Sequence, residues 1–80
     1  QLLEIEDLQK QVHNVVNSLP ERCRIIFEKY LYNNKSPQEI AEELDISVNT
    51  VRVQIKNAMD KMKVKLGTSL GILLLFLFQK

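Results

Sequence analysis

The sequence contains few of the residues from which metal, redox and catalytic sites are built. Its 80 residues include one cysteine and one histidine. A single cysteine can form neither an internal disulfide nor a cysteine-based metal site, and Cys23 falls on an apolar helix stripe, which predicts a buried thiol. His13 falls on a polar helix face with no second histidine or partnered acid, which predicts a solvated side chain. We therefore expect neither a metal ion nor a cofactor.

Catalytic motifs are also absent from the sequence. With two glycines in the chain, there is no Gly-rich phosphate-binding loop, and there is no CxxC pair and no nucleophile elbow. The acidic residues are scattered over positions that are expected to face solvent, so they predict no catalytic dyad. These absences predict a protein that is not an enzyme. The chain starts without Met inside a helical pattern, which predicts a fragment of a longer protein.

The charges are unevenly distributed along the chain, although the net charge is only +1. Residues 1–45 carry nine acids and five bases, whereas residues 46–80 carry six bases and one acid. This asymmetry predicts a basic face for an anionic partner and an acidic remainder that keeps the domain soluble. The helix dipole explains three lysines near the end of the last predicted helix, but it does not explain Arg52 and Lys56 near its start.

Apolar residues at helical spacing predict an all-α fold. Serines are expected to cap two of the helices, Ser18 with Glu21 three residues later and Ser36 with Glu39 three residues later, the pattern of a capping box. The predicted helices span four ranges: 1–18, 20 to about 32, 37–44 and 48–66. We expect them to pack as a small bundle of four helices in one domain, residues 1–66.

The last two of these helices form a helix-turn-helix pattern over residues 36–56. Asp45 follows the shorter helix at a position where the chain is expected to turn through positive φ, and Ser47 is expected to cap the longer helix. One stripe of the longer helix is apolar and predicted to be buried, while its opposite side is polar and basic. A short capped helix, a tight turn and a second helix with a basic N-terminal half are typical of DNA-binding domains.

The last part of the chain, residues 67–80, contains a run of nine apolar or glycine residues at 70–78. Leucine favours helix, so we predict a short apolar helix here. This helix would be about 14 Å long, whereas the hydrocarbon core of a membrane is about 30 Å thick, so we expect no membrane span. An exposed helix that is apolar on all sides needs covering, which predicts packing on the core or a homo-oligomer.

Four sequence runs in fixed register resemble region four of bacterial RNA polymerase sigma factors of the extracytoplasmic-function class. These runs are LPERCR at 19–24 followed by Phe27, SPQEIAEEL at 36–44, ISVNTVR at 46–52 and NAMDKMK at 57–63. The resemblance covers roughly residues 11–66 without gaps. Two features depart from the family pattern: Asp45 stands where glycine is common at the turn, and the apolar tail has no counterpart in the DNA-binding motif.

The resemblance implies a four-helix domain whose last helix enters the major groove at the upstream (minus-thirty-five) promoter element and which also docks on core RNA polymerase. It further implies transcription initiation in the bacterial cytoplasm and an anti-sigma factor as a partner. From the residues alone, Lys35 beside the start of the third helix is a candidate phosphate ligand, although a solvated turn lysine explains it equally well. The residues implied by position to contact bases or the DNA backbone are Ser36, Gln38, Ser47, Asn49, Thr50, Arg52, Val53, Lys56 and Asn57.

Two alternatives to a sigma factor stay open. The DNA-binding domain of LuxR-type response regulators shares the runs at 36–41 and 46–52, but it usually opens with L-[TS]-x-R-E and commonly carries a histidine where this chain has Gln54. We therefore favour the sigma-factor interpretation. The other alternative is a protein-interaction module that acts through the tail at 70–78, which does not exclude DNA binding.

Overall fold

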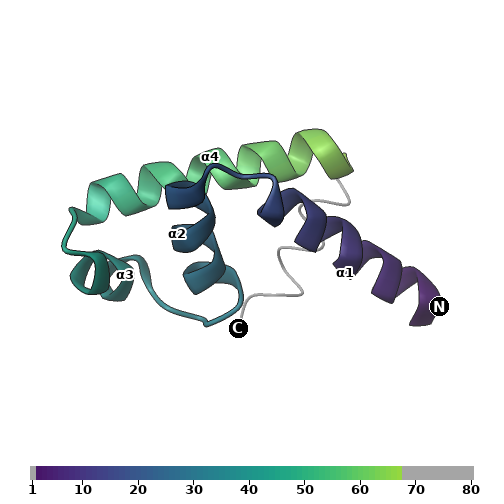
Figure 1. The fold of residues 1–80 in the computed structure, drawn as a ribbon, viewed down its shortest axis with the longest axis horizontal. Helices are drawn as coiled ribbons and strands as arrows, with labels where there is room; N and C mark the ends of the chain where they lie inside the picture. The colour runs from purple at the N-terminus through teal and green to yellow at the C-terminus, as the bar shows by residue number, and fades with distance from the viewer. Residues whose placement is uncertain (1, 68–80) are drawn as a thin grey trace.

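The computed structural model describes residues 2–67, and this part of the chain consists of helices and short connections without a strand (Figure 1). The all-α prediction is therefore confirmed. The predicted apolar helix at 70–78 lies outside the described residues. Within 2–67, no helix combines the length and the apolar character that a membrane crossing requires. The four helices are α1 (Leu2–Asn17), α2 (Glu21–Leu31), α3 (Pro37–Leu44) and α4 (Val48–Leu66).

The longest helix, α4, packs against each of the other three helices. Figure 1 shows α3 beside the N-terminal end of α4, α1 towards its C-terminal end, and α2 crossing between them. Because α3 contacts α4 near its N-terminal end and α1 contacts it towards its C-terminal end, the orientation of α4 is fixed from both ends. Its N-terminal half is held at the edge of the domain, where its outer face is open to solvent.

The core is formed by one apolar stripe from each helix. The side chains of Ile26, Phe27, Ile40, Val51 and Met62 are all fully buried. Full burial of a side chain of this size stabilises the fold by about 1.5–3 kcal/mol, so this cluster accounts for much of the packing between helices. No polar or charged side chain is buried in the part of the chain that the structure describes. The predicted stripes are thus confirmed as core, including Cys23, which is 6% exposed.

One predicted helix cap is wrong. Ser18 does not cap α2; its hydroxyl donates to the carbonyl of Val15 at 2.7 Å and closes the end of α1. The N-cap of α2 is Pro20, which makes no side-chain capping hydrogen bond. The backbone N–H groups of Ser18 and Leu19 donate to carbonyls of α1 and so continue its C-terminal end, and the chain becomes extended only at Pro20, whose ψ is 150°.

Candidate nucleic-acid interface

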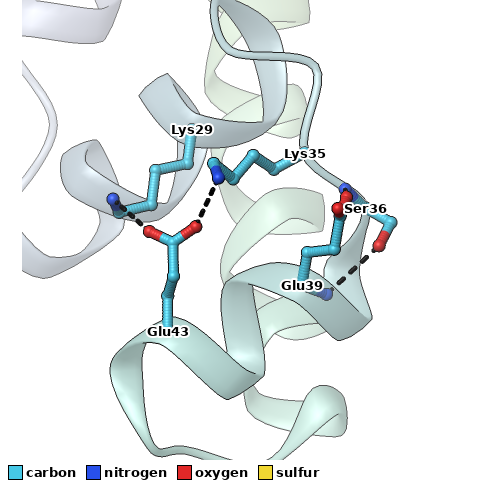
Figure 2. A network of polar contacts seen from close by, with 5 residues as sticks. All are labelled: Lys29, Lys35, Ser36, Glu39 and Glu43. Carbon is cyan, nitrogen blue, oxygen red and sulfur yellow. Dashed lines mark hydrogen bonds and ion pairs between the residues drawn. The ribbon is translucent and has the colours of Figure 1, made fainter.

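The first helix of the candidate interface, α3, begins at the predicted capping box (Figure 2). The Ser36 hydroxyl accepts a hydrogen bond from the backbone N–H of Glu39 at 3.1 Å, and the Glu39 carboxylate accepts one from the backbone N–H of Ser36 at 2.8 Å. The hydrogen bond from the Ser36 backbone N–H is the largest cause of the lowered pKa of the Glu39 carboxyl. Pro37 has no N–H group, so these two bonds satisfy two of the three N–H groups left free at this helix start, which fixes where α3 begins.

The turn between α3 and α4 passes through Asp45, whose φ is 56° and ψ is 49°. The positive φ predicted from the sequence is confirmed. The backbone N–H of Ile46 donates to the carbonyl of Ala41 at 3.1 Å and thereby closes the end of α3. A non-glycine residue in this left-handed conformation is strained, and Asp is one of the side chains that tolerate it best. The angle between α3 and α4 therefore depends on one strained residue.

The second helix, α4, begins at Ser47. The Ser47 hydroxyl accepts from the backbone N–H of Thr50 at 3.0 Å, as predicted, and lies 2.8 Å from the Thr50 hydroxyl. The first turn of α4 contains no acidic residue. The positive end of the helix dipole is therefore not offset by a carboxylate in that turn, which favours an anion close to this end.

The two faces of α4 differ as the sequence predicts. The inner face is buried along its length by Val51, Ile55, Ala58, Met62 and Leu66. The outer face is exposed, and its apolar member Val53 keeps 48% of its surface accessible. Eight of the ten predicted DNA-binding residues are exposed; Lys35 and Ser36 are half-buried. The exposed ones are Gln38, Ser47, Asn49, Thr50, Arg52, Val53, Lys56 and Asn57.

The start of α3 and the basic residues of α4 lie close together. Pro37, the first residue of α3, lines the same surface groove as Arg52 and Lys56. Sequence spacing alone does not bring these residues together, because Pro37 and Arg52 belong to different helices. The predicted backbone contacts around Ser36 and the predicted base contacts of α4 therefore share one side of the domain.

The Lys35 side chain, a candidate phosphate ligand from the sequence, reaches the Glu43 carboxylate on α3. Its ammonium lies 2.7 Å from one carboxylate oxygen of Glu43, and the Lys29 ammonium lies 2.7 Å from the other (Figure 2). The hydrogen bonds from Lys29 and then Lys35 lower the pKa of the Glu43 carboxyl, and the hydrogen bond to Glu43 raises the pKa of Lys35. A phosphate contact by Lys35 would have to replace this carboxylate partner.

Another ion pair lies on α4 itself. The Lys56 ammonium is 2.9 Å from a carboxylate oxygen of Asp60, one helical turn later. The side chains are 75% and 51% exposed, so the pair is open to solvent and Lys56 can exchange its partner. The sequence contains a signal for this pair, a base and an acid four residues apart, but the pair was not predicted.

Cys23 lies in the core and His13 lies at the surface, as the sequence predicts. The Cys23 thiol is buried, burial raises its pKa, and its sulfur lies 3.5 Å from the carbonyl oxygen of Gln54. His13 is exposed, and its Nδ1 lies 3.2 Å from the Tyr32 hydroxyl. Among the described residues, no three His, Cys, Asp or Glu side chains cluster closely enough to hold a metal ion.

Comparison with known proteins identifies the family. Residues 9–62 match the family model "Sigma-70, region 4". Spore germination protein GerE of Bacillus subtilis (strain 168) is 51% identical over 47 residues, which are 59% of this chain and 62% of that protein. The chain thus spans about three fifths of the length of this curated relative. No solved structure matches significantly. The chain belongs to the sigma-70 region 4 family and is a helix-turn-helix DNA-binding domain, not an enzyme.

Proposed function

We propose that this chain is the DNA-binding domain of a LuxR-type transcription regulator. The observation that carries the proposal is the 51% identity to GerE, which favours this alternative over the sigma factor that the sequence motifs alone indicated. Both kinds of protein use the same helix-turn-helix, so the recognition chemistry proposed for α4 is common to them. A regulator that binds chromosomal DNA would act in the bacterial cytoplasm.

Base recognition is assigned to the N-terminal half of α4. A recognition helix contacts base edges with residues near its N-terminus, and the outer face of this half of α4 is exposed and free of acids in its first turn. The Arg52 guanidinium has the fork geometry that pairs with O6 and N7 of guanine. Val53 is apolar and exposed, which suits contact with a thymine methyl group. Asn49 and Asn57 flank these two residues on the same outer face.

Backbone contacts are assigned to the helix starts and to Lys56. Ser36, Gln38, Ser47 and Thr50 present hydroxyl and amide groups at the N-terminal ends of α3 and α4, where helix dipoles favour phosphate. Lys56 is exposed on α4 and suits a phosphate as a point charge. Lys35 belongs to this set only if phosphate displaces Glu43. These contacts set the position of the helix, and the base contacts supply specificity.

The sigma-factor interpretation is the second candidate. The family model and the LPERCR opening at 19–24 favour it. It differs from the LuxR-type proposal in its partners, because it requires docking on core RNA polymerase at a minus-thirty-five element and includes control by an anti-sigma factor. A LuxR-type domain, in contrast, is expected to select its site on duplex DNA without the polymerase.

Two binding measurements separate the candidates. Duplexes would be enriched from a random pool with the purified chain alone, and the labelled chain would also be titrated with core RNA polymerase. The LuxR-type proposal predicts a preferred sequence without polymerase and no saturable binding to the polymerase. Saturable binding to the polymerase, together with sequence preference only in its presence, would instead establish the sigma-factor candidate.

A further inference from the structure

A groove of about 410 Å³ runs along one side of α4. Its floor is apolar and aromatic: Tyr30 from α2, Pro37 from α3, and Ile55 and Met59 from α4 line it. Tyr30 and Met59 are half-buried and pack against the core, so the floor is held by three helices and keeps its shape. The volume falls within the range of pockets that accept ligand side chains. We call this surface the α4 groove.

The edge of the α4 groove is basic. Arg52, Lys56 and Lys63 line it, together with one acid, Asp60. Among the described residues, neither Arg52 nor Lys63 forms an ion pair, while Asp60 is already paired with Lys56 at 2.9 Å. Arg52 and Lys63 are eleven positions apart, which is about 16 Å along a helix. A row of cations of this length fits an elongated anionic partner better than a single anion.

We propose that the α4 groove is a docking site for an acidic amphipathic segment of another protein, in which carboxylates flank a bulky apolar side chain. The apolar side chain would pack on Tyr30 and Met59, and the carboxylates would pair with Arg52 and Lys63. Because Asp60 already pairs with Lys56 at 2.9 Å, Arg52 and Lys63 are the cations of this edge that remain for the carboxylates of a partner. Amphipathic segments that bind in this way place apolar anchors in a groove and charges at its rim.

The same groove fits a DNA backbone less well. A phosphodiester chain has no apolar group to cover Met59 and Tyr30. An apolar side chain that covers them removes apolar surface from water, and this burial increases its affinity. Lys63 also lies about two turns beyond Lys56, outside the N-terminal half of α4 that is assigned to the major groove. The occupant that satisfies both the floor and the edge is therefore a protein segment.

The position of the groove has a regulatory consequence, which rests on the proposed DNA-binding function. Arg52 and Lys56 belong both to the α4 groove and to the proposed DNA contacts. A segment that occupies them removes two of the contacts needed by the duplex and adds negative charge beside its phosphates. The acidic segment and DNA are therefore expected to exclude each other.

The test uses the complete chain and a synthetic peptide, EELLEEFLEE, with QQLLQQFLQQ as its uncharged counterpart. Binding would be followed by amide chemical shifts of the isotope-labelled chain and by anisotropy of the labelled peptide. Lys63→Glu reverses a charge at the groove, and Lys61→Glu makes the same change on an exposed part of α4 that does not line the groove. Thermal melting would establish that both variants fold.

The proposal predicts shifts concentrated at Tyr30, Met59 and Lys63, and no binding of the glutamine peptide. Lys63→Glu should lower the affinity for the acidic peptide about fivefold, which is the upper end for an exposed ion pair. Lys61→Glu should lower it by less than about twofold. Absent binding, or equal loss in the two variants, would overturn the assignment, because only unspecific charge attraction would then act. If Lys63→Glu lowers the affinity for duplex DNA but not for the peptide, the assignment to an acidic segment is overturned in favour of a DNA backbone site.

Competition is measured separately, by adding unlabelled peptide to the chain bound to a labelled duplex. Displacement of the duplex supports mutual exclusion, and simultaneous binding of peptide and duplex would overturn it. If the chain binds the peptide with the Lys63 dependence but binds no duplex, the DNA-binding assignment of α4 fails while the α4 groove stands. The two proposals can thus fail independently.

Discussion

The Lys56 ammonium lies 2.9 Å from the Asp60 carboxylate on the exposed side of α4. In the proposed DNA contacts, Asp60 would compete with phosphate for Lys56 and place a negative charge beside the duplex. Asp60→Asn should strengthen duplex binding about twofold to fivefold at low salt, because an exposed pair of this kind contributes up to about 1 kcal/mol. It should also steepen the dependence of log affinity on log salt. Anisotropy titrations over a range of salt concentrations measure both quantities.

The matched control for this change is Glu6→Gln, which removes one negative charge from the exposed surface of α1. It changes the net charge of the chain by the same amount as Asp60→Asn. The Glu6 variant should bind the duplex nearly as the parent does. Equal gains in the two variants would show that net charge, and not the release of Lys56, sets the affinity.

The left-handed turn at Asp45 predicts a second pair of variants. Asp45→Val should destabilise the domain by about 1–2 kcal/mol, because a β-branched side chain is strongly disfavoured at positive φ. Asp45→Gly should change stability by less than about 1 kcal/mol, since relief of strain is offset by the greater freedom of glycine in the unfolded chain. Urea unfolding measures both changes.

Asn34 provides the comparison for Asp45, because its φ of 57° is nearly the same but it lies outside the turn of the helix-turn-helix. Asn34→Val should lower stability by a similar amount. DNA affinity under folding conditions should fall further in Asp45→Val, since only that turn sets the angle between α3 and α4. Equal affinities in the two folded variants would argue against this role of the turn.

The Glu43 carboxylate, held between Lys29 and Lys35, predicts a pH dependence of stability. Its pKa is lowered from the ordinary value of 4.5, with the hydrogen bond from Lys29 as the largest cause. A carboxyl with a lowered pKa in the folded state stabilises fully above its ordinary pKa and loses this contribution as pH falls through the folded value. Glu43→Gln should therefore be less stable than the parent at neutral pH and approach it as the pH falls through the lowered pKa of Glu43.

Urea unfolding at several pH values measures this difference, with Glu42→Gln as the control. Glu42 is the exposed neighbour of Glu43 on α3 and takes part in none of the four ion pairs of the described residues. The Glu42 variant should follow the parent across the pH range. A stability gap between Glu43→Gln and the parent that stays constant from neutral to strongly acidic pH would contradict the assignment of the effect to ion pairing.

The apolar run at 70–78 lies outside the described residues and keeps its prediction from the sequence. We propose that residues 67–80 form a packing or oligomerisation segment beside the DNA-binding domain 1–66. The chain should then elute as a homo-oligomer on a sizing column with light scattering. Replacing Leu73 and Leu75 with lysine should shift it to a monomer. A parent chain that stays monomeric at high concentration would contradict self-association.

Much of the fold follows from local sequence patterns. The capping box at Ser36 and Glu39, the left-handed turn at Asp45 and the cap at Ser47 each depend on residues within a few positions of one another, so the sequence contains the whole signal. The apolar stripes are local in the same sense. Ser18 was misassigned because its hydroxyl donates back to Val15 of α1, an alternative to capping α2 that the spacing of Ser18 and Glu21 does not exclude.

Apart from the Lys56–Asp60 pair and the Ser18–Val15 bond, the features that the sequence did not predict join distant parts of the chain. Glu43 meets Lys29 across two helices, and Tyr30 lines a groove with Arg52 and Lys63; neither relationship has a spacing that identifies it. The choice between a sigma factor and a LuxR-type regulator is of another kind. Both families need the same cap, turn and basic helix for the same chemistry, so these motifs identify the DNA-binding domain and leave the partner undetermined.

The most direct test of DNA recognition by α4 is the salt dependence of duplex binding in three variants. The preferred duplex would be titrated against the parent, Arg52→Ala, Lys56→Ala and the control Lys65→Ala, which removes an exposed charge in the last turn of α4. Arg52→Ala should lose about 1–3 kcal/mol of discrimination at one base pair. Lys56→Ala should lower the affinity for duplexes of every sequence by a similar factor and reduce the slope of log affinity against log salt by about one unit. Lys65→Ala should resemble the parent. Unchanged binding and slope in both Arg52→Ala and Lys56→Ala would contradict the placement of α4 in the major groove.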